Sequence, residues 1–558
     1  MNDREAIDID LVDRWFPAGL PELQHWETYF APRRLPPDAE VTRFAPSPTG
    51  SMHLGGLYVA ALARESARAG GGVYLVRIED TDKRREVAGA EAEFEQVFAY
   101  FGLTADEGAG AGGAHGPYRQ SEREEIYLSH ARELVRKGLA YPCFCSADDL
   151  ARGTAEQQAS RSPIGYYGKW APCRGLSTAE AGRRIAAGES FTVRLRCQVG
   201  LPGRVRFRDR IRGALTMLDN GNDVVILKSA ESGVRLPTYH FAHVVDDHLM
   251  GVTLVIRGEE WISSLPVHRQ LHEALGFTPP AYAHIAPLMK VDGGNRRKLS
   301  KRKDPESAAA FYVAAGYPAP AVLHYLRGLA NSRLMELPTR EALAEPVRLA
   351  EAGLSGPLVD LARLRSLSRD HIASLEPRAA LAGLRDWAAA HDPGLAGVLA
   401  RNEGAALAAF EIARRGSGTP RKDLACWSEF REAYGFCFPE LYTPVVSPGD
   451  ERFGGLAPEL VARVAADLAA EPLLAERRLD PLRDLAERHG FAPDTRSYRA
   501  APERYRGSVS DVANVLRVCV TGRRHSPDLF QILTALGEPE IHRRLSPLAS
   551  HVEPPLCV

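Results

Sequence analysis

Apolar and polar positions change their spacing along the chain near residue 330. Before this point, short β-prone runs alternate with helically spaced segments, as in the run 41–46, the segment 57–69 and the run 73–78. Two strands joined through a helix form a βαβ unit, which is typical of a parallel sheet. After residue 330 the chain is rich in Ala, Leu, Arg and Glu at helical spacing. The pattern therefore predicts an α/β N-terminal half and a mainly helical C-terminal half.

The same spacing predicts further elements around the βαβ unit. Residues 1–40 form a helical, partly aromatic extension that ends at Pro36-Pro37. Asp304 followed by Pro305 predicts the start of a helix, because aspartate favours the N-cap and proline the first helical position. The other expected elements are helices over 88–101, 118–140 and 260–275, and strands over 191–196, 224–228 and 252–257.

Composition excludes several classes of protein. The 558 residues are 45% hydrophobic and 25% charged, which is ordinary for a globular enzyme of several domains. The net charge of −1 gives no overall basic field, so any nucleic-acid surface must be local. No run of 18 apolar residues and no secretory signal are present, so we expect no membrane partner. Eight cysteines are too few for a disulfide scaffold, which favours a cytoplasmic location.

The segment 41–56 carries the most chemical information. It reads Val-Thr-Arg-Phe-Ala-Pro-Ser-Pro-Thr-Gly-Ser-Met-His-Leu-Gly-Gly. A strand here leads to a helix N-terminus, where free backbone N–H groups attract phosphate. His53 adds a donor, and Gly55 and Gly56 remove side chains where a ligand must approach the backbone. A lone His-x-Gly-Gly also fits an ordinary turn, so the interpretation depends on later motifs.

Two later segments place charged groups where predicted strands end. The strand over 73–78 ends in Glu79-Asp80-Thr81-Asp82, where a carboxylate can hold an ammonium group or a ribose hydroxyl. Arg257 ends the next such strand and can bind a carboxylate through two hydrogen bonds. Trp261 follows as a candidate pocket residue. Taken singly, these segments also fit a solvated turn and a core tryptophan.

A run of cations follows Gly293-Gly294. Residues 296–303 contain six lysines and arginines in eight positions. We expect a mobile basic loop that can stabilise the charge of a departing pyrophosphate. A solvated basic turn or a contact with a nucleic-acid backbone remains an alternative.

Together these segments resemble class I aminoacyl-tRNA synthetases, and from about residue 41 onward the chain is similar to bacterial glutamyl-tRNA synthetases. The segments 46–56 and 298–302 are similar to the two ATP signatures of that family. Further blocks typical of the family are 77–82, 118–123, 245–248, 516–518 and 521–523. Residues 1–40, with 165–170 and 301–305, resemble a longer subtype.

The resemblance implies a Rossmann-type parallel sheet with an inserted acceptor-end-binding subdomain, followed by a helical anticodon-binding half. It also implies a monomer. The implied parts are a helical extension (1–40), a catalytic domain (41–140 and 236–290), the inserted subdomain (141–235), a second-signature loop with a helical connector (291–335) and a helical anticodon-binding region of one or two domains (336–558).

The implied activity is ATP-dependent activation of L-glutamate and transfer to the 3′-terminal adenosine of tRNA(Glu), with Mg²⁺ accompanying ATP. Whether tRNA(Gln) is also charged stays open. The implied amino-acid pocket is Arg43, Ala45, Ser47, Glu79, Tyr239 and Arg257. The implied ATP site is His53, Gly55, Gly56 and Lys301, with His53, Lys298 and Lys301 as catalytic residues. Gly56 departs from the histidine that the signature has elsewhere in the class.

Cys143, Cys145 and Cys173 form a candidate structural zinc site. Three thiolates suit Zn²⁺, which needs a fourth ligand. The resemblance implies Tyr167 for that position, although its spacing from Cys173 is longer than expected. The alternative is a set of free buried cysteines.

Three other identities remain open from the sequence. A glutaminyl-tRNA synthetase would carry a β-barrel C-terminal half, and a truncated relative that charges a tRNA base would lack the helical half. An inactive paralogue would bind tRNA without catalysis, against which the intact His53 and Lys301 argue. Expected phosphate contacts in the C-terminal half are Arg414, Arg415, Arg421, Lys422, Arg504, Arg506, Arg523 and Arg524.

Overall fold

The chain forms two compact units. The computed structural model describes residues 7–197, 203–230, 233–412, 414, 420–474 and 480–552. The first unit is Met1–Val313 with Leu323–Asp360, and the second is Ala314–Val322 with Leu361–Val558. The finer domain boundaries expected from the sequence remain predictions.

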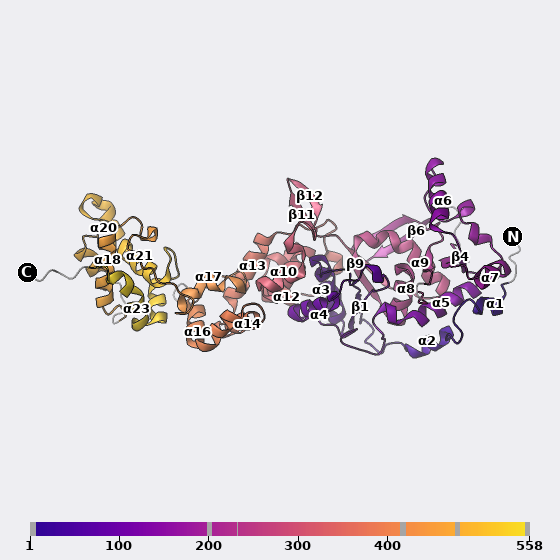
Figure 1. Cartoon of the computed structure of the whole chain (residues 1–558), viewed down its shortest axis with the longest axis horizontal. Helices are drawn as coiled ribbons and strands as arrows, with labels where there is room; N and C mark the ends of the chain where they lie inside the picture. The colour runs from indigo at the N-terminus through magenta and orange to yellow at the C-terminus, as the bar shows by residue number, and fades with distance from the viewer. Residues whose placement is uncertain are drawn as a thin grey trace, which may run out of the picture. The chain divides into compact units, whose positions relative to one another are not determined.

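The first unit contains a seven-stranded sheet, part of which is labelled in Figure 1. The strands in spatial order are β3 (Glu107–Gly108), β2 (Val73–Val76), β1 (Val41–Phe44), β9 (Leu254–Gly258), β10 (Ala281–Ile285), β6 (Arg204–Asp209) and β7 (Gly213–Leu218). Neighbouring strands are parallel from β3 to β6, and β7 pairs antiparallel with β6. All four residues of β1 are buried, as expected for a parallel sheet covered on both faces. The predicted α/β half is confirmed.

The helix that follows β1 begins at the predicted His-x-Gly-Gly segment. Helix α3 spans Leu54–Ala69, so it starts three residues before the segment predicted from spacing. His53 is its N-cap, and the imidazole Nδ1 accepts a hydrogen bond from the backbone N–H of Gly55 at 2.9 Å. The first backbone N–H groups of a helix have no carbonyl partner within the helix, and the capping side chain accepts a hydrogen bond from one of them.

Further helices of the first unit surround the sheet and the inserted segment. They are α1 (Ile9–Asp13), α2 (Leu23–Tyr29), α4 (Ala90–Phe101), α5 (Glu124–Arg136), α6 (Ala147–Ala159), α7 (Thr178–Ala186), α8 (Tyr239–Leu249), α9 (Leu265–Leu275) and α12 (Thr339–Ala344). Helices α10 (Ala309–Ala315) and α11 (Ala319–Ala330) contribute residues to both units.

The inserted segment has its own small sheet. Its three antiparallel strands are β4 (Ala140–Cys143), β5 (Thr192–Leu195) and β8 (Val225–Leu227). Residues 204–218, which the sequence grouped with this segment, instead extend the large sheet as the hairpin β6–β7. This hairpin brings Asp209 next to β10.

The N-terminal extension packs on the first unit. Helix α1 contacts α5 and α7, and α2 contacts α5. Five apolar side chains of the extension join the buried cluster that contains α5 and α8: Val12, Phe16, Leu20, Trp26 and Phe30. Residues 1–6 lie outside the described part of the chain.

The basic run begins in a hairpin strand and continues as the predicted loop over residues 299–304. Strand β11 (Met289–Asp292) pairs antiparallel with β12 (Asn295–Lys298), and Figure 1 shows this hairpin extending from the first unit. Asp304 and Pro305 begin a helical turn as predicted, but it is a short 3-10 helix, Pro305–Ser307, and the Asp304 side chain makes no capping hydrogen bond to it. The Asp304 carboxylate instead accepts two hydrogen bonds from Arg297, at 2.6 and 2.8 Å, and one from the backbone N–H of Ser300 at 2.9 Å.

The second unit is helical, and its described residues contain no strand. Its helices are α13 (Leu361–Ser374), α14 (Pro377–His391), α15 (Pro393–Arg401), α16 (Glu403–Ile412), α17 (Phe430–Tyr434), α18 (Pro458–Ala470), α19 (Asp480–Arg488), α20 (Thr495–Ala500), α21 (Val509–Thr521), α22 (Leu529–Leu536) and α23 (Glu538–Ala549). One buried cluster from Ile372 to Leu548 forms its core. Across the described residues of both units, no helix has the length and apolar character needed to cross a membrane.

Candidate active site

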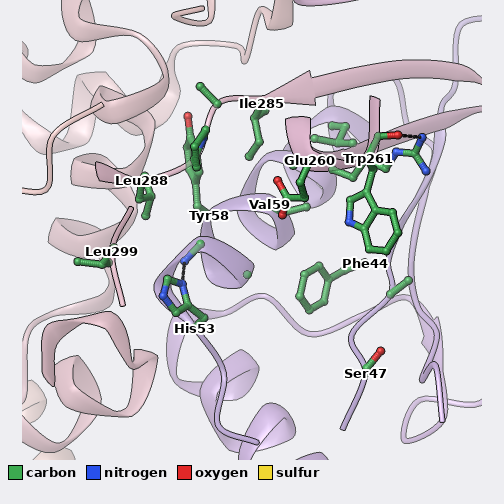
Figure 2. A pocket seen from close by; sticks show the side chains of 18 of the residues that line it. Phe44, Ser47, His53, Tyr58, Val59, Glu260, Trp261, Ile285, Leu288 and Leu299 are labelled. Atoms are coloured by element: carbon green, nitrogen blue, oxygen red, sulfur yellow. Dashed lines mark hydrogen bonds between the residues drawn. The ribbon is translucent and has the colours of Figure 1, made fainter. Parts of the chain in front are cut away.

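A cavity of about 530 Å³ in the first unit brings together residues from distant parts of the chain. It lies where β1 and β9 end and α3 begins, which is where doubly wound sheets bind ligands. In Figure 2, His53, Leu288 and Leu299 lie on one side of this pocket, and Phe44, Ser47 and Trp261 lie on the other. The lining includes all eleven residues assigned above to glutamate and ATP: Arg43, Ala45, Ser47, His53, Gly55, Gly56, Glu79, Tyr239, Arg257, Lys298 and Lys301.

The start of α3 and the lysine segment meet on one side of the cavity. Lys301 Nζ donates to the carbonyl oxygen of Ser51 at 2.6 Å, which joins the two segments that resemble ATP signatures. Gly56 lies close to other side chains. A Cβ at this position would be 3.0 Å from Met52 Sδ and 3.3 Å from Phe44 Cζ. Close packing around the start of α3 therefore explains why residue 56 is a glycine.

The electrostatics of this side keep His53 neutral. Burial lowers the pKa of His53, and the positive charges of Lys301 and Lys298 lower it further. A neutral imidazole is consistent with Nδ1 accepting from Gly55, so its Nε2 carries the proton. A hydrogen bond to the backbone of Leu299 opposes these effects on the pKa, so the imidazole joins the lysine segment to the helix N-terminus, where phosphate oxygens would bind.

Arg43 and Glu79 belong to a buried ionic network on the other side of the cavity. Asp247 accepts from Arg77 NH1 at 2.6 Å and from Arg43 Nε at 3.4 Å. Arg77 NH2 also donates to Glu79 at 3.3 Å. The side chains of Arg43, Arg77 and Asp247 are at most 4% exposed, and that of Glu79 is 9% exposed. Such pairing fixes the two pocket residues in place.

The sequence analysis missed the internal members of this network. Asp246 and Asp247 were expected to be family-typical or helix-end charges; they do lie in the last turn of α8, but both are buried. Asp246 binds Arg123 at 2.8 Å and accepts from Tyr127 at 2.8 Å. Two adjacent acids in an otherwise apolar helix, and an arginine two positions before Glu79, were the available signals.

Arg257 is oriented by contacts on three sides. Its NH2 donates to the carbonyl oxygen of Trp261 at 3.2 Å, and its NH1 donates to Tyr239 Oη at 3.3 Å. Its Nε donates to His284 Nε2 at 3.0 Å. The sequence analysis also missed His284, whose only signal was a polar residue within a buried strand.

Comparisons with known proteins agree with this site. Residues 40–364 match the family described as tRNA synthetases class I (E and Q), catalytic domain, and residues 503–548 match an anticodon binding domain. A glutamate–tRNA ligase from Clostridium beijerinckii is 39% identical over 538 residues, which cover 94% of this chain and 96% of that protein. The chain belongs to the glutamate–tRNA ligase family. Membership makes the protein a class I aminoacyl-tRNA synthetase, as its motifs predicted.

More distant members of the glutamate–tRNA ligase family also match along nearly the whole chain. A ligase from Thermus thermophilus is 35% identical over 511 residues, covering 90% of this chain and 98% of that protein. The crystal structure of a glutamate tRNA ligase from Elizabethkingia meningosepticum in complex with its amino acid has a TM-score of 0.74 at 25% identity. It covers 92% of this chain and 100% of its own. The helical second unit excludes both the β-barrel alternative and the truncated one.

The three cysteines predicted to hold zinc lie together in the inserted segment. The ligand atoms of Cys143, Cys145 and Cys173 all lie within 4.8 Å of one another, and the Sγ atoms of Cys145 and Cys173 are 3.6 Å apart. The hydroxyl of Tyr166 lies 3.3 Å from Cys143 Sγ and 3.2 Å from Cys145 Sγ. In a tetrahedral site with Zn–S bonds of about 2.3 Å, ligand atoms are about 3.7 Å apart. The donor set therefore fits zinc.

The prediction that Tyr167 completes this set is wrong. Its hydroxyl donates to the carbonyl oxygen of Pro163 at 2.6 Å, outside the thiol cluster. The backbone at Tyr167 is extended, so adjacent side chains point to opposite sides. The neighbouring Tyr166 occupies the place beside the thiols.

The expected phosphate contacts of the second unit differ in their surroundings. Arg414 donates from all three of its nitrogens to the carbonyl oxygens of Leu375, Phe410 and Ile372, so its role is structural. Arg415 lies outside the described residues. A cavity of about 400 Å³ in this unit is lined by both arginines and carboxylates: Arg365, Arg369, Arg421, Arg523, Asp423, Glu429 and Glu432.

Proposed function

We propose that the protein activates L-glutamate with ATP and transfers the glutamyl group to the 3′-terminal adenosine of tRNA(Glu). The convergence of the α3 N-terminus, the lysine segment and two buried arginines in one cavity carries this proposal. In activation, a substrate carboxylate attacks the α-phosphate of ATP, which forms glutamyl-adenylate and releases pyrophosphate. The reaction needs alignment and charge stabilisation but no protein nucleophile. Mg²⁺ would enter with ATP as part of the substrate.

Each side of the cavity supplies a different part of this chemistry. Arg43 and Arg257 bring two positive charges to a substrate with two carboxylates, and Glu79 would accept the α-ammonium group. Ala45, Ser47 and Tyr239 would complete the amino-acid pocket. His53, Gly55 and Gly56 would meet the nucleotide, and Lys298 and Lys301 would neutralise its phosphates during transfer.

ATP–pyrophosphate exchange tests the proposal directly. The assay should contain purified tRNA(Glu), because members of this family generally need tRNA for activation. We expect exchange with L-glutamate and at least 100-fold less with L-glutamine, since an amide offers no charge to the arginines. Exchange with neither amino acid and any tRNA would instead support an inactive tRNA-binding paralogue. Charging of purified tRNA(Gln) in the same preparation would determine whether that tRNA is a second substrate.

We also propose that the thiol cluster binds one structural Zn²⁺ through Cys143, Cys145, Cys173 and Tyr166. A hydrogen bond with Cys173 lowers the pKa of the Cys143 thiol, whereas the pKa values of Cys145 and Cys173 are raised, so zinc binding would release protons from these thiols. We expect close to one equivalent of zinc in protein purified without chelators. Tyr166→Phe should lower zinc retention in a competition with chelator, whereas Tyr167→Phe should not. Less than about a tenth of an equivalent in the wild type would contradict the site.

The second unit would bind the anticodon part of the tRNA. The cavity lined by Arg369 and Arg523 also contains carboxylates that pair with Arg421 and Arg365, so Arg369 and Arg523 are the arginines proposed to contact phosphates or stack on unpaired bases. The KM for tRNA should therefore rise with salt more steeply than the KM for glutamate, because phosphate contacts release counterions.

A further inference from the structure

A chain of three side chains connects Arg257 to β6, the strand next to the edge of the large sheet. Arg257 lies on β9, His284 on β10 and Asp209 at the end of β6. Arg257 Nε donates to His284 Nε2 at 3.0 Å, and His284 Nδ1 lies 2.7 Å from Asp209 Oδ2. All three residues are buried, with exposures of 5%, 0% and 3% in that order. The three strands are adjacent in the sheet, so the side chains follow its hydrogen-bonding direction.

The surroundings of Asp209 determine which nitrogen of His284 carries the proton. One carboxylate oxygen of Asp209 accepts from the backbone N–H groups of Ile211 and Arg212, both at 2.9 Å. The backbone N–H of His284 also donates to this carboxylate, at 3.2 Å. An ionised carboxylate can only accept, so His284 Nδ1 must donate to it. Nε2 is then left without a proton and accepts from Arg257, whose guanidinium can only donate.

The charges around His284 are consistent with this neutral form. Arg257 faces it from β9, Arg212 donates to its backbone carbonyl oxygen at 3.1 Å, and the Tyr282 ring stacks on it at 5.9 Å. Burial lowers the pKa of His284, and the charge of Arg257 adds to this effect against the hydrogen bond to Asp209. Burial alone would raise the pKa of Asp209, but the hydrogen bonds from His284 and the backbone outweigh it and lower the pKa.

We propose that Asp209 and His284 are positioning residues that hold the Arg257 guanidinium in the orientation that receives a carboxylate of glutamate. With Nε on His284 and NH2 on Trp261 and Ser264, the guanidinium plane is fixed. Its NH1 then faces Tyr239 in the cavity. The inference deepens the proposed function, because it rests on Arg257 binding glutamate.

Two substitutions of His284 separate its two hydrogen bonds. In His284→Gln, the amide oxygen can take the place of Nε2 and accept from Arg257. In His284→Asn, the shorter amide can take the place of Nδ1 and donate to Asp209, but nothing reaches Arg257. We expect the KM for glutamate in tRNA-dependent pyrophosphate exchange to rise about 10- to 100-fold in His284→Asn and less than about threefold in His284→Gln. The KM for ATP should stay within about twofold in both.

A double-substitution cycle keeps the proposal testable if His284→Asn folds poorly. Asp209→Asn should raise the KM for glutamate in the wild-type background, because an amide no longer dictates the tautomer of His284. The same substitution should have little further effect in the His284→Gln background, because glutamine has no tautomers. A pH profile adds a second readout. Because the pKa of His284 is lowered, its protonation should begin well below pH 6.5, and there it should raise the KM for glutamate in the wild type more than in His284→Gln.

The outcomes distinguish this inference from the proposed function. Equal KM values for glutamate in His284→Asn, His284→Gln and the wild type would overturn the positioning role. Equal effects of Asp209→Asn in both backgrounds would also overturn it. If Arg257→Ala itself leaves the KM for glutamate unchanged, then Arg257 does not bind the substrate and the proposed function of that residue fails first.

Discussion

At the scale of residues, the pocket contains charges that are fixed before any substrate binds. Arg43 and Glu79 are held through Asp247 and Arg77, and Arg257 is held through His284. A buried charge held by its partners needs little reorganisation when a ligand arrives, which favours tight binding of an ion of opposite sign. The two arginines therefore act from defined positions rather than as flexible surface cations.

Arg257 provides the clearest residue-scale prediction. Replacing it with alanine should weaken glutamate recognition by about 2–5 kcal/mol, because a buried carboxylate loses its charged partner. Arg257→Lys should recover only part of this loss, since lysine keeps the charge but cannot reach Trp261, Tyr239 and His284 together. The measurement is the KM for glutamate in pyrophosphate exchange. An unchanged KM in both variants would remove Arg257 from the pocket.

The pocket lining was predictable from the sequence, but its supporting contacts were not. The resemblance to the family implied the lining residues, and several of them lie at strand ends or helix starts, which parallel strands place at one edge of the sheet. Asp209 and His284 are far apart in the chain and meet only because β6 lies beside β10. Strand order in the sheet is set by tertiary packing, which local spacing does not encode. Tyr166, and not the predicted Tyr167, lies beside the thiols. In extended backbone adjacent side chains point to opposite sides, and spacing in the sequence cannot resolve which of the two faces the cysteines.

At the scale of elements, the β11–β12 hairpin and the turn after it are held by one carboxylate. Asp304 binds Arg297 of β12 and the backbone N–H of Ser300, so it closes the turn that carries Lys301. These hydrogen bonds, led by that of Arg297, lower the pKa of Asp304 below its usual range. Asp304 therefore supports the turn at both ends, and the mobility expected from its composition remains a prediction.

Asp304→Ala should impair the chemical step without affecting amino-acid binding. Lys301 would lose its defined position, so we expect kcat for pyrophosphate exchange to fall about 10-fold or more, with the KM for glutamate unchanged. Asp292→Ala is a matched control, because Asp292 pairs with the same Arg297 at 2.7 Å but its side chain is 52% exposed. That exposed pair should contribute little. Equal effects of the two substitutions would contradict a positioning role for Asp304.

Element boundaries were predicted where local chemistry defines them. Strand β1 and helix α3 were found with shifts of a few residues, since His53 caps the helix earlier than the apolar spacing indicates. The hairpin and the strands β6 and β7 were not predicted, because they consist largely of exposed cations and alternating residues. Pairing with a neighbour, rather than intrinsic propensity, stabilises such strands.

At the scale of the whole molecule, the first unit buries several neutral histidines. Burial lowers the pKa of His130 to about 4 and lowers the pKa values of His243 and His268 well below 6.5. The unfolded chain binds protons at these sites below pH 6.5, whereas the folded chain does not until its lower pKa is reached. The stabilisation is thus complete above pH 6.5 and is lost as the pH falls toward 4.

This linkage predicts an acid-sensitive first unit. When the pH falls from 7.5 to 5, His130 alone should lower the free energy of unfolding by about 2 kcal/mol. His130→Phe removes the titrating group in a buried position next to Phe277. Thermal unfolding at the two pH values should show a smaller drop in Tm for this variant than for the wild type. An equal drop in both proteins would contradict the assignment of His130 as a buried neutral side chain.

The N-terminal extension has a practical consequence for anyone who shortens this protein. Phe30 lies against the guanidinium of Arg123, which in turn binds Asp246, and Arg33 holds Glu107 with two short hydrogen bonds. A polypeptide that began at residue 40 would expose the apolar surface around α5 that the extension covers, and Glu107 would lose its Arg33 partner. Such a shortened protein should aggregate during purification even though every catalytic side chain is retained.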